Sequence, residues 1–139
     1  MYQSIQGNLG LGKAIEYFTS HNIMIAIPLN DTQKYDLIAE INGRLSKISV
    51  KTGRFSTTNG QSYNILLKNC GGSSGKSKVR LFDKNSCDYL FCVIGDNRMF
   101  LIPSQDITAV NTICIGLKYL EYEVKSKQLS EFNEQEMVD

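Results

Sequence analysis

Three residues with different chemistry, Asp36, Ser49 and Lys51, are expected to lie together at one end of a β-hairpin. The signal for the hairpin is Asn42-Gly43, because both residues tolerate the positive φ that a type I′ turn requires. With these two residues as the loop, Asp36 lies directly opposite Ser49, and Lys51 is its diagonal neighbour at about 7–8 Å. A single turn would therefore bring a carboxylate, a hydroxyl and an amine together.

A carboxylate beside an amine suits metal-assisted hydrolysis of a phosphodiester. Mg²⁺ prefers oxygen ligands, so Asp36 would hold the ion and the backbone carbonyl of Val50 would be a further ligand. Lys51 would orient the attacking water or balance the negative charge that develops on the phosphate. The alternative interpretation is a surface Asp–Lys pair on a solvated sheet face.

The residues of this hairpin alternate between two faces, as in a sheet with one buried side. Leu37, Ala39, Ile41, Ile48 and Val50 share the apolar face, whereas Asp36, Glu40, Lys47, Ser49 and Lys51 lie on the other.

The elements that must position the hairpin predict a small α/β (α+β) domain around one mixed sheet. A turn at residues 7–10 leads into a helix that ends near residues 21–22, with an apolar stripe that runs from Leu11 to Phe18. Residues 23–27 predict a short buried strand. Further strands are expected at residues 62–67, 88–94, 98–102 and 112–115, and a flanking C-terminal helix over residues 117–132.

Length and composition indicate one globular domain over residues 1–139, with an acidic tail from about residue 125. The longest apolar run, residues 23–29, is far shorter than the roughly 20 residues of a membrane-spanning helix. The first residues do not form a signal peptide, so we expect a cytoplasmic protein with no membrane association. The four cysteines include no Cys-x-x-Cys pair and are expected to be reduced thiols.

A net charge of +1 hides a strongly uneven distribution of charge. Residues 43–80 contain eight basic residues and no Asp or Glu, whereas the last 19 residues contain six acids and two lysines. Such a stretch is typical of a surface that binds a polyanion, and the alternative is a scattered solvated surface balanced by the acidic tail. The candidate phosphate contacts are Arg44, Lys47, Arg54, Lys68, Lys76, Lys78 and Arg80.

Segments 7–15, 27–31, 35–39 and 50–53, in this order, resemble the group I intron-encoded endonuclease branch of the PD-(D/E)XK nucleases. Residues 88–93 and 100–103 match a downstream strand pair that ends in Leu-Ile-Pro, and the resemblance covers about residues 7–107. It implies a restriction endonuclease-like core in which an N-terminal helix precedes the hairpin that carries the site.

The resemblance also implies an activity: cleavage of duplex DNA with Mg²⁺, for which Mn²⁺ can substitute, by a homodimer or homotetramer. Asp36 takes the place of the metal-binding Asp and Lys51 that of the catalytic Lys. Two positions depart from the pattern. Ser49 stands where the family has Glu, Asp or Gln, and Leu11 stands where many members have a Glu at the start of the first helix.

Three functions therefore remain open. The first is an Mg²⁺-dependent DNA endonuclease, in which Ser49 would hydrogen-bond a water of the site. The second is a catalytically degenerate nuclease fold that serves as a DNA-binding or protein-interaction module in phage or host defence. The third is a structural or inhibitory protein that has kept only the scaffold. Ser49 and Leu11 are the residues that separate the first function from the second.

Overall fold

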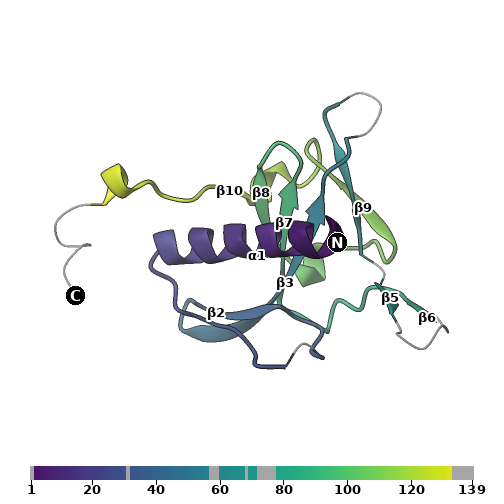
Figure 1. Ribbon diagram of the computed structural model, residues 1–139, viewed down its shortest axis with the longest axis horizontal. Helices are drawn as coiled ribbons and strands as arrows, with labels where there is room; N and C mark the ends of the chain where they lie inside the picture. Colours follow the sequence, from purple (N-terminus) through teal and green to yellow (C-terminus); the bar gives the residue numbers. More distant parts are fainter. Residues whose placement is uncertain (1, 31, 57–59, 68, 72–77, 133–139) are drawn as a thin grey trace.

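A long helix lies across one face of a mixed sheet in the computed structural model, which describes residues 2–30, 32–56, 60–67, 69–71 and 78–132 (Figure 1). The helix is α1 (Tyr2–Ser20), and the sheet has six strands in the order β1-β2-β3-β7-β8-β10. All neighbouring strands in it are antiparallel except β3 and β7. The strands are β1 (Ile25–Ala26), β2 (Leu37–Ile41), β3 (Arg44–Gly53), β7 (Tyr89–Ile94), β8 (Met99–Pro103) and β10 (Glu123–Val124).

Two smaller antiparallel sheets accompany the main sheet. The first joins β4 (Tyr63–Leu66) to β9 (Thr112–Ile115), and the second joins β5 (Asn69–Gly71) to β6 (Lys78–Arg80). Together with β7 and β8, strands β4 and β9 confirm the positions predicted near residues 62–67, 88–94, 98–102 and 112–115, whereas β5 and β6 were not predicted. Short 3-10 turns occur at η1 (Ser104–Asp106), η2 (Leu120–Tyr122) and η3 (Leu129–Glu131).

The hairpin of β2 and β3 has the register that its turn predicts. Ile41 pairs with Arg44 and Leu37 with Ile48, which leaves residues 42 and 43 as the loop. Both loop residues have positive φ, 53° at Asn42 and 77° at Gly43, as a type I′ turn requires. The predicted register is confirmed because the turn residues and the alternation of apolar and polar side chains both specify it within this short segment.

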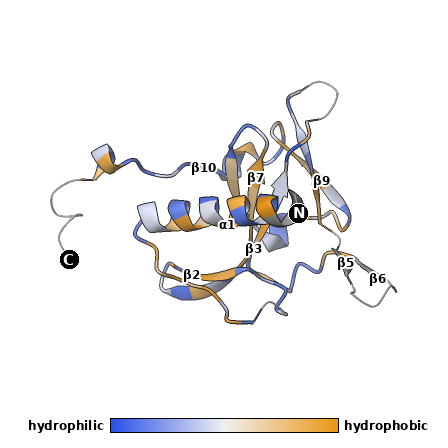
Figure 2. Ribbon diagram, viewed as in Figure 1, coloured by the Kyte–Doolittle hydropathy of each residue, from blue (hydrophilic) through white to orange (hydrophobic). Residues whose placement is uncertain are grey.

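The main sheet separates two hydrophobic clusters, which Figure 2 shows as hydrophobic colour along β7 and on the adjoining elements. Phe18 of α1 packs with Leu37, Ile48 and Phe91 on one face. On the other face, Leu90, Cys92, Phe100 and Ile102 pack with residues of β4 and β9, such as Ile65 and Ile113. Because β7 contributes to both clusters, it reads as a continuous apolar run rather than an alternating one.

The helix begins earlier than the sequence predicted. Residues 7–10 were expected to form a turn, but they lie inside α1, which ends at Ser20 and is followed by Asn22 with a φ of 58°. A Cβ at Gly10 would lie 2.6 Å from Thr52 Cγ2 and 3.2 Å from Val50 Cγ1. Gly10 therefore lies where the helix packs tightly against β3, and this tertiary contact outweighs the low helix propensity of glycine.

The helix predicted over residues 117–132 is wrong. This segment forms η2, the two-residue strand β10 and η3, and Tyr119 has a φ of 65°. Its residues 123 and 124 pair with Phe100 and Met99 of β8, and Arg98 binds Glu123 with Nε–Oε2 and Nη2–Oε1 distances of 3.1 and 2.9 Å. Pairing with the sheet edge satisfies the backbone of this segment, so tertiary contacts override its helical pattern.

The strand predicted over residues 23–27 is shorter and less buried than expected. Only Ile25 and Ala26 pair, and β1 is an edge strand of the sheet. The side chains of Met24 and Ile27 are 72% and 52% exposed.

Cysteine state and membrane topology were also predicted from the sequence. Among the described side chains, Cys87, Cys92 and Cys114 are free thiols, as expected. In the described part of the chain, no helix is long and apolar enough to cross a bilayer.

Candidate active site

Asp36 lies immediately before β2 and hydrogen-bonds to β3 on both sides of Ser49. Its backbone N donates to the Ile48 carbonyl at 2.8 Å, and its Oδ2 accepts from the Val50 N at 2.6 Å. The carboxylate thus accepts the hydrogen bond that the backbone of a longer β2, extended before Leu37, would accept from β3. Asp36 and Ser49 are therefore adjacent, as the hairpin register predicts.

The backbone of Val50 offers a second oxygen at the same point. In an extended strand the N–H and C=O of one residue point to the same edge, so the Val50 carbonyl faces the side on which Asp36 binds the N–H. The last β2–β3 pair is Leu37 with Ile48, so Val50 lies beyond that ladder. A carboxylate and a carbonyl are hard oxygen donors, and the exposed position of Asp36 admits waters. These donors fit a magnesium ion.

The donor set nevertheless holds few charged ligands. In the described residues there is no group of three or more His, Cys, Asp or Glu side chains that could hold a metal ion. Asp36 is the carboxylate in direct contact with the Val50 backbone.

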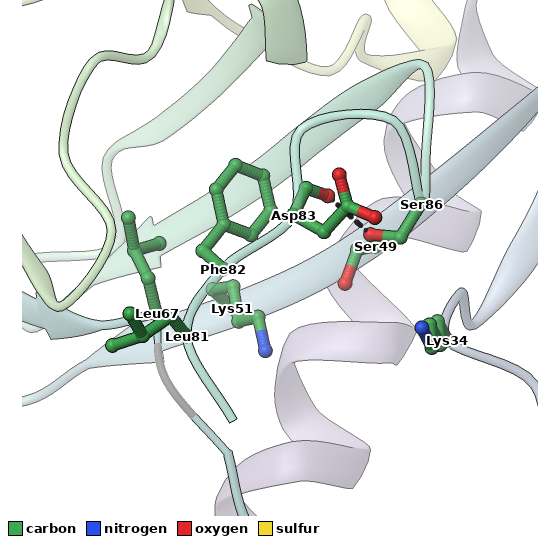
Figure 3. A pocket seen from close by; sticks show the side chains of 8 residues that line it. All are labelled: Lys34, Ser49, Lys51, Leu67, Leu81, Phe82, Asp83 and Ser86. Atoms are coloured by element: carbon green, nitrogen blue, oxygen red, sulfur yellow. Dashed lines mark hydrogen bonds between the residues drawn. The ribbon is translucent and has the colours of Figure 1, made fainter. Parts of the chain in front are cut away.

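Ser49 and Lys51 line one pocket on the face of β3 opposite α1 (Figure 3). Ser49 is 5% exposed and Lys51 is half-buried. Burial raises the pKa of the nearby thiols, Cys87 to about 11 and Cys92 to about 12, and the positive charge of Lys51 opposes both shifts. These thiols stay protonated at neutral pH and do not act as nucleophiles.

Two further residues of this pocket, Lys34 and Asp83, were not predicted as site residues. Lys34 lies two residues before Asp36, so its position near the hairpin was a signal that the sequence offered. Asp83 lies between β6 and β7, and no local pattern connects it to Ser49. The remaining lining residues are Leu67, Leu81, Phe82 and Ser86.

A second aspartate, Asp88, binds β3 from its other edge. Asp88 Oδ2 accepts from the Lys47 N at 2.8 Å, and Asp88 N donates to the Lys47 carbonyl at 2.8 Å. Asp36 and Asp88 therefore make the same kind of backbone contact to β3, one on each side. Asp88 makes this contact away from Lys51, so a hydrogen bond from a strand N–H to an aspartate stabilises the fold even where no candidate site is present.

The predicted phosphate-binding residues are spread along β3 and beyond it. Arg44 lies 3.9 Å from Asp88, the Lys47 ammonium lies 5.6 Å from the Tyr35 ring centre, and Arg54 stacks 4.4 Å from the Phe55 ring centre. All three are exposed, and none lines the pocket of Lys51. Lys68 and Lys76 lie outside the described residues, and Lys78 and Arg80 are described only as backbone of β6.

Comparison with known proteins identifies the family of this chain. A family model described as "PD-(D/E)XK endonuclease" matches residues 1–136. The chain belongs to the PD-(D/E)XK endonuclease family. No curated protein matches the sequence.

The structure of this member of the family is similar to that of the bacterial homing endonuclease I-Ssp6803I. The TM-score is 0.69, with 17% sequence identity over 94% of this chain and 84% of the other. At this identity the similarity shows a shared fold. The resemblance and the mixed α/β fold class that the sequence predicted are confirmed.

The family description itself places an Asp or Glu two residues before the lysine. On the resemblance drawn from the sequence, the corresponding segment of this chain would be Ser49-Val50-Lys51, in which a buried hydroxyl stands at the position of the acid. Leu11, the other departure, packs against the cluster under α1.

Proposed function

We propose that this chain is an Mg²⁺-dependent endonuclease that hydrolyses phosphodiester bonds of duplex DNA, with Mn²⁺ as a substitute. The observation that carries the proposal is the 2.6 Å hydrogen bond from the Val50 N to Asp36 Oδ2. It sets a carboxylate beside the carbonyl edge of the strand whose next residue, Lys51, lines a pocket. Membership of an endonuclease family supports the reaction class.

In this mechanism Asp36 and the Val50 carbonyl would hold the divalent ion. The ion, when bound, polarises the phosphate and lowers the pKa of a water. Lys51 brings a positive charge to the same strand, where it orients the attacking water and balances the charge that develops on the phosphate. Ser49 contributes a hydroxyl that hydrogen-bonds a water of the site but adds no charge.

Duplex DNA is the partner that the site and the charge distribution support. Each chain carries one Asp36–Lys51 site, so cleavage of both strands of a two-fold symmetric duplex calls for two chains in a homodimer or for a homotetramer. Basic residues along and after β3, Arg44, Lys47 and Arg54, would contact phosphates.

One observation favours a second candidate, a nuclease fold that binds DNA without cutting it. Ser49 replaces the acid of the family pattern, which leaves Asp36 as the carboxylate in contact with Val50. A site with one carboxylate offers Mg²⁺ little negative charge, so it binds the ion weakly until substrate phosphates add their own oxygens.

The test is cleavage of supercoiled plasmid in Mg²⁺ and in Mn²⁺ by the wild type and by Asp36→Asn. The amide oxygen of Asn can still accept the Val50 N–H, so the variant keeps the backbone contact and loses the charge. Asp88→Asn is the matched control, because Asp88 makes the same backbone contact on the other edge of β3. EDTA should abolish wild-type cleavage.

We expect the wild type and Asp88→Asn to cleave and Asp36→Asn to be inactive at an unchanged melting temperature. If Asp36→Asn cleaves as well as Asp88→Asn does, Asp36 is only a backbone cap and the proposed site is wrong. If the folded wild type shifts duplex DNA in a gel but does not cleave it, the second candidate is correct.

A further inference from the structure

Ser49 has one aspartate next to its backbone and a second aspartate in the pocket that it lines. Asp36 binds the backbone on both sides of Ser49, through the Ile48 carbonyl and the Val50 N–H. Asp83 shares with Ser49 and Lys51 the pocket on the polar face of β3. Figure 3 shows Asp83, Ser49 and Ser86 gathered at its centre, with Lys51 to one side and Lys34 to the other.

A tight turn holds Asp83 in this position. Its Oδ1 accepts from the Asn85 N at 2.9 Å, and its carbonyl accepts from the Ser86 N at 3.0 Å and the Ser86 Oγ at 2.6 Å. The preceding residue, Phe82, packs against the core and donates its N–H to the Val110 carbonyl at 2.9 Å. The turn is thus anchored on both sides, and Asp83 Oδ2 has no hydrogen-bond partner among the side chains and backbone that the structure describes.

The short side chain of Ser49 leaves room in the pocket next to the Asp83 carboxylate. The family pattern has an acid at this position, and a Glu there would extend into the pocket that Asp83 lines. Because serine is short and uncharged, the volume and the negative charge of a Glu side chain are both missing at this position. Asp83 lines this pocket with Ser49, whereas Asp36 lies outside its lining and reaches β3 through the Val50 backbone. Together the two carboxylates would supply the charged oxygen donors that a divalent ion takes, and Lys34 and Lys51 give the same pocket positive charge for a phosphate.

We propose that Asp83 supplies the second carboxylate of the site, in place of the acid that Ser49 lacks. The Asp83 carboxylate would bind the ion directly or through a water that the ion holds. In both arrangements its negative charge lies beside Ser49. This inference rests on the proposed function, since it assigns a further residue to the same metal-dependent cleavage.

The first test measures the affinity of the DNA-free protein for Mn²⁺, by calorimetry or by the electron paramagnetic resonance of free Mn²⁺. Asp83→Asn should weaken binding by at least about tenfold, the loss typical of removing a group that supports a metal site. Asn can still accept the Asn85 N–H, so the turn is kept. Asp96→Asn is the matched control, because Asp96 Oδ1 accepts from Arg98 N at 3.2 Å in a similar turn outside this pocket.

The second test returns the acid to the strand. Ser49→Glu in the Asp83→Asn background places a carboxylate at the family position, and it should restore both Mn²⁺ affinity and plasmid cleavage toward wild-type levels. Ser49→Gln in the same background supplies the length without the charge and should restore less of the Mn²⁺ affinity.

The outcomes separate this inference from the proposed function. If Asp36→Asn weakens Mn²⁺ binding and Asp83→Asn leaves it at the wild-type value, the site exists and Asp83 is not part of it. If the wild type binds no Mn²⁺ and cleaves no DNA, both the function and the inference fail. A loss in Asp83→Asn that Ser49→Glu does not recover would indicate a structural role for the turn and overturn the inference.

Discussion

At the scale of single residues, Lys51 has surroundings that differ from those of a solvated surface lysine. It is half-buried on the face of β3 that carries Ser49, and its charge acts on the thiols of Cys87 and Cys92. Lys47, four residues earlier on the same strand, is exposed and lies over the Tyr35 ring. Position along one strand thus separates a site lysine from a surface lysine.

We predict that Lys51→Ala lowers single-turnover cleavage about 10²–10³-fold, the typical cost of removing one group that stabilises transition-state charge. Lys118→Ala, an exposed lysine outside the basic stretch, should cleave at nearly the wild-type rate. Rates would be read on a labelled duplex at saturating protein, with circular dichroism to confirm the fold. Equal rates for the two variants would remove Lys51 from the mechanism.

At the scale of elements, the site depends on how closely α1 lies against β3. Gly10 approaches Val50 and Thr52, and the Gln6 side chain donates to Thr52 Oγ1 at 2.6 Å. These contacts lie on the strand that carries Lys51, on the face away from its pocket. Any shift of the helix is therefore transmitted to the backbone of the site.

We predict opposite effects from two alanine substitutions in α1. Gly10→Ala should destabilise the protein by about 1–3 kcal/mol, because its Cβ would lie 2.6 Å from Thr52 Cγ2. Gly12→Ala should stabilise it by up to about 1 kcal/mol, since nothing lies within 4 Å of that Cβ and alanine favours helix. Urea unfolding of both variants measures the difference, and a stabilising Gly10→Ala would contradict the packing.

The C-terminal segment is held to the sheet edge by the pairing of β10 with β8 and by one bidentate ion pair, and two further contacts join it to the end of α1. Arg98 binds both oxygens of Glu123 in β10, and this hydrogen bond holds the pKa of the Glu123 carboxyl below its usual value. Further along, Ser20 Oγ accepts from Lys127 N at 2.9 Å, and His21 Nε2 lies 2.7 Å from the Lys125 carbonyl. The segment therefore ties β8 to the end of α1.

We predict that Glu123→Gln costs about 1 kcal/mol at pH 7 and flattens the acid side of the stability profile. Because the folded-state pKa of Glu123 is lowered, its contribution is fully present above the unfolded value of about 4.3 and is lost as pH falls through the folded value. Glu121→Gln, an exposed neighbour, is the control. Thermal melts from pH 7 to pH 3 test this, and parallel profiles would contradict it.

At the scale of the whole molecule, charge is divided between a basic stretch at residues 43–80 and an acidic C-terminal end. The described part of that stretch follows β3 and the residues after it, where Arg54 is exposed over Phe55. A DNA duplex that reaches Lys51 would meet these cations, and each phosphate contact releases counterions.

We predict that Arg54→Ala weakens binding to duplex DNA at all sequences and reduces the slope of log Kd against log salt by about one. Lys118→Ala, an exposed cation outside the basic stretch, should leave the slope unchanged. Fluorescence anisotropy in EDTA, across a salt series, gives both values. A binding constant independent of salt would exclude a phosphate-binding surface altogether.

The sequence by itself determined the hairpin, its register and the pairing of Asp36 with Ser49. A type I′ turn at Asn42-Gly43 and the alternation of β2 and β3 are local properties, so a short window contains the information. The ordered motifs likewise sufficed to predict the family and the mixed α/β fold.

Only the tertiary structure decided what surrounds that hairpin. The parallel pairing of β3 with β7, the strand at Glu123–Val124 in place of a helix and the position of Asp83 beside Ser49 all depend on residues far apart in the chain. Local propensity cannot encode such contacts, because burial of β7 between two clusters and backbone pairing at the sheet edge outweigh it. The turn chemistry of the sequence thus places the first carboxylate, and packing places the second.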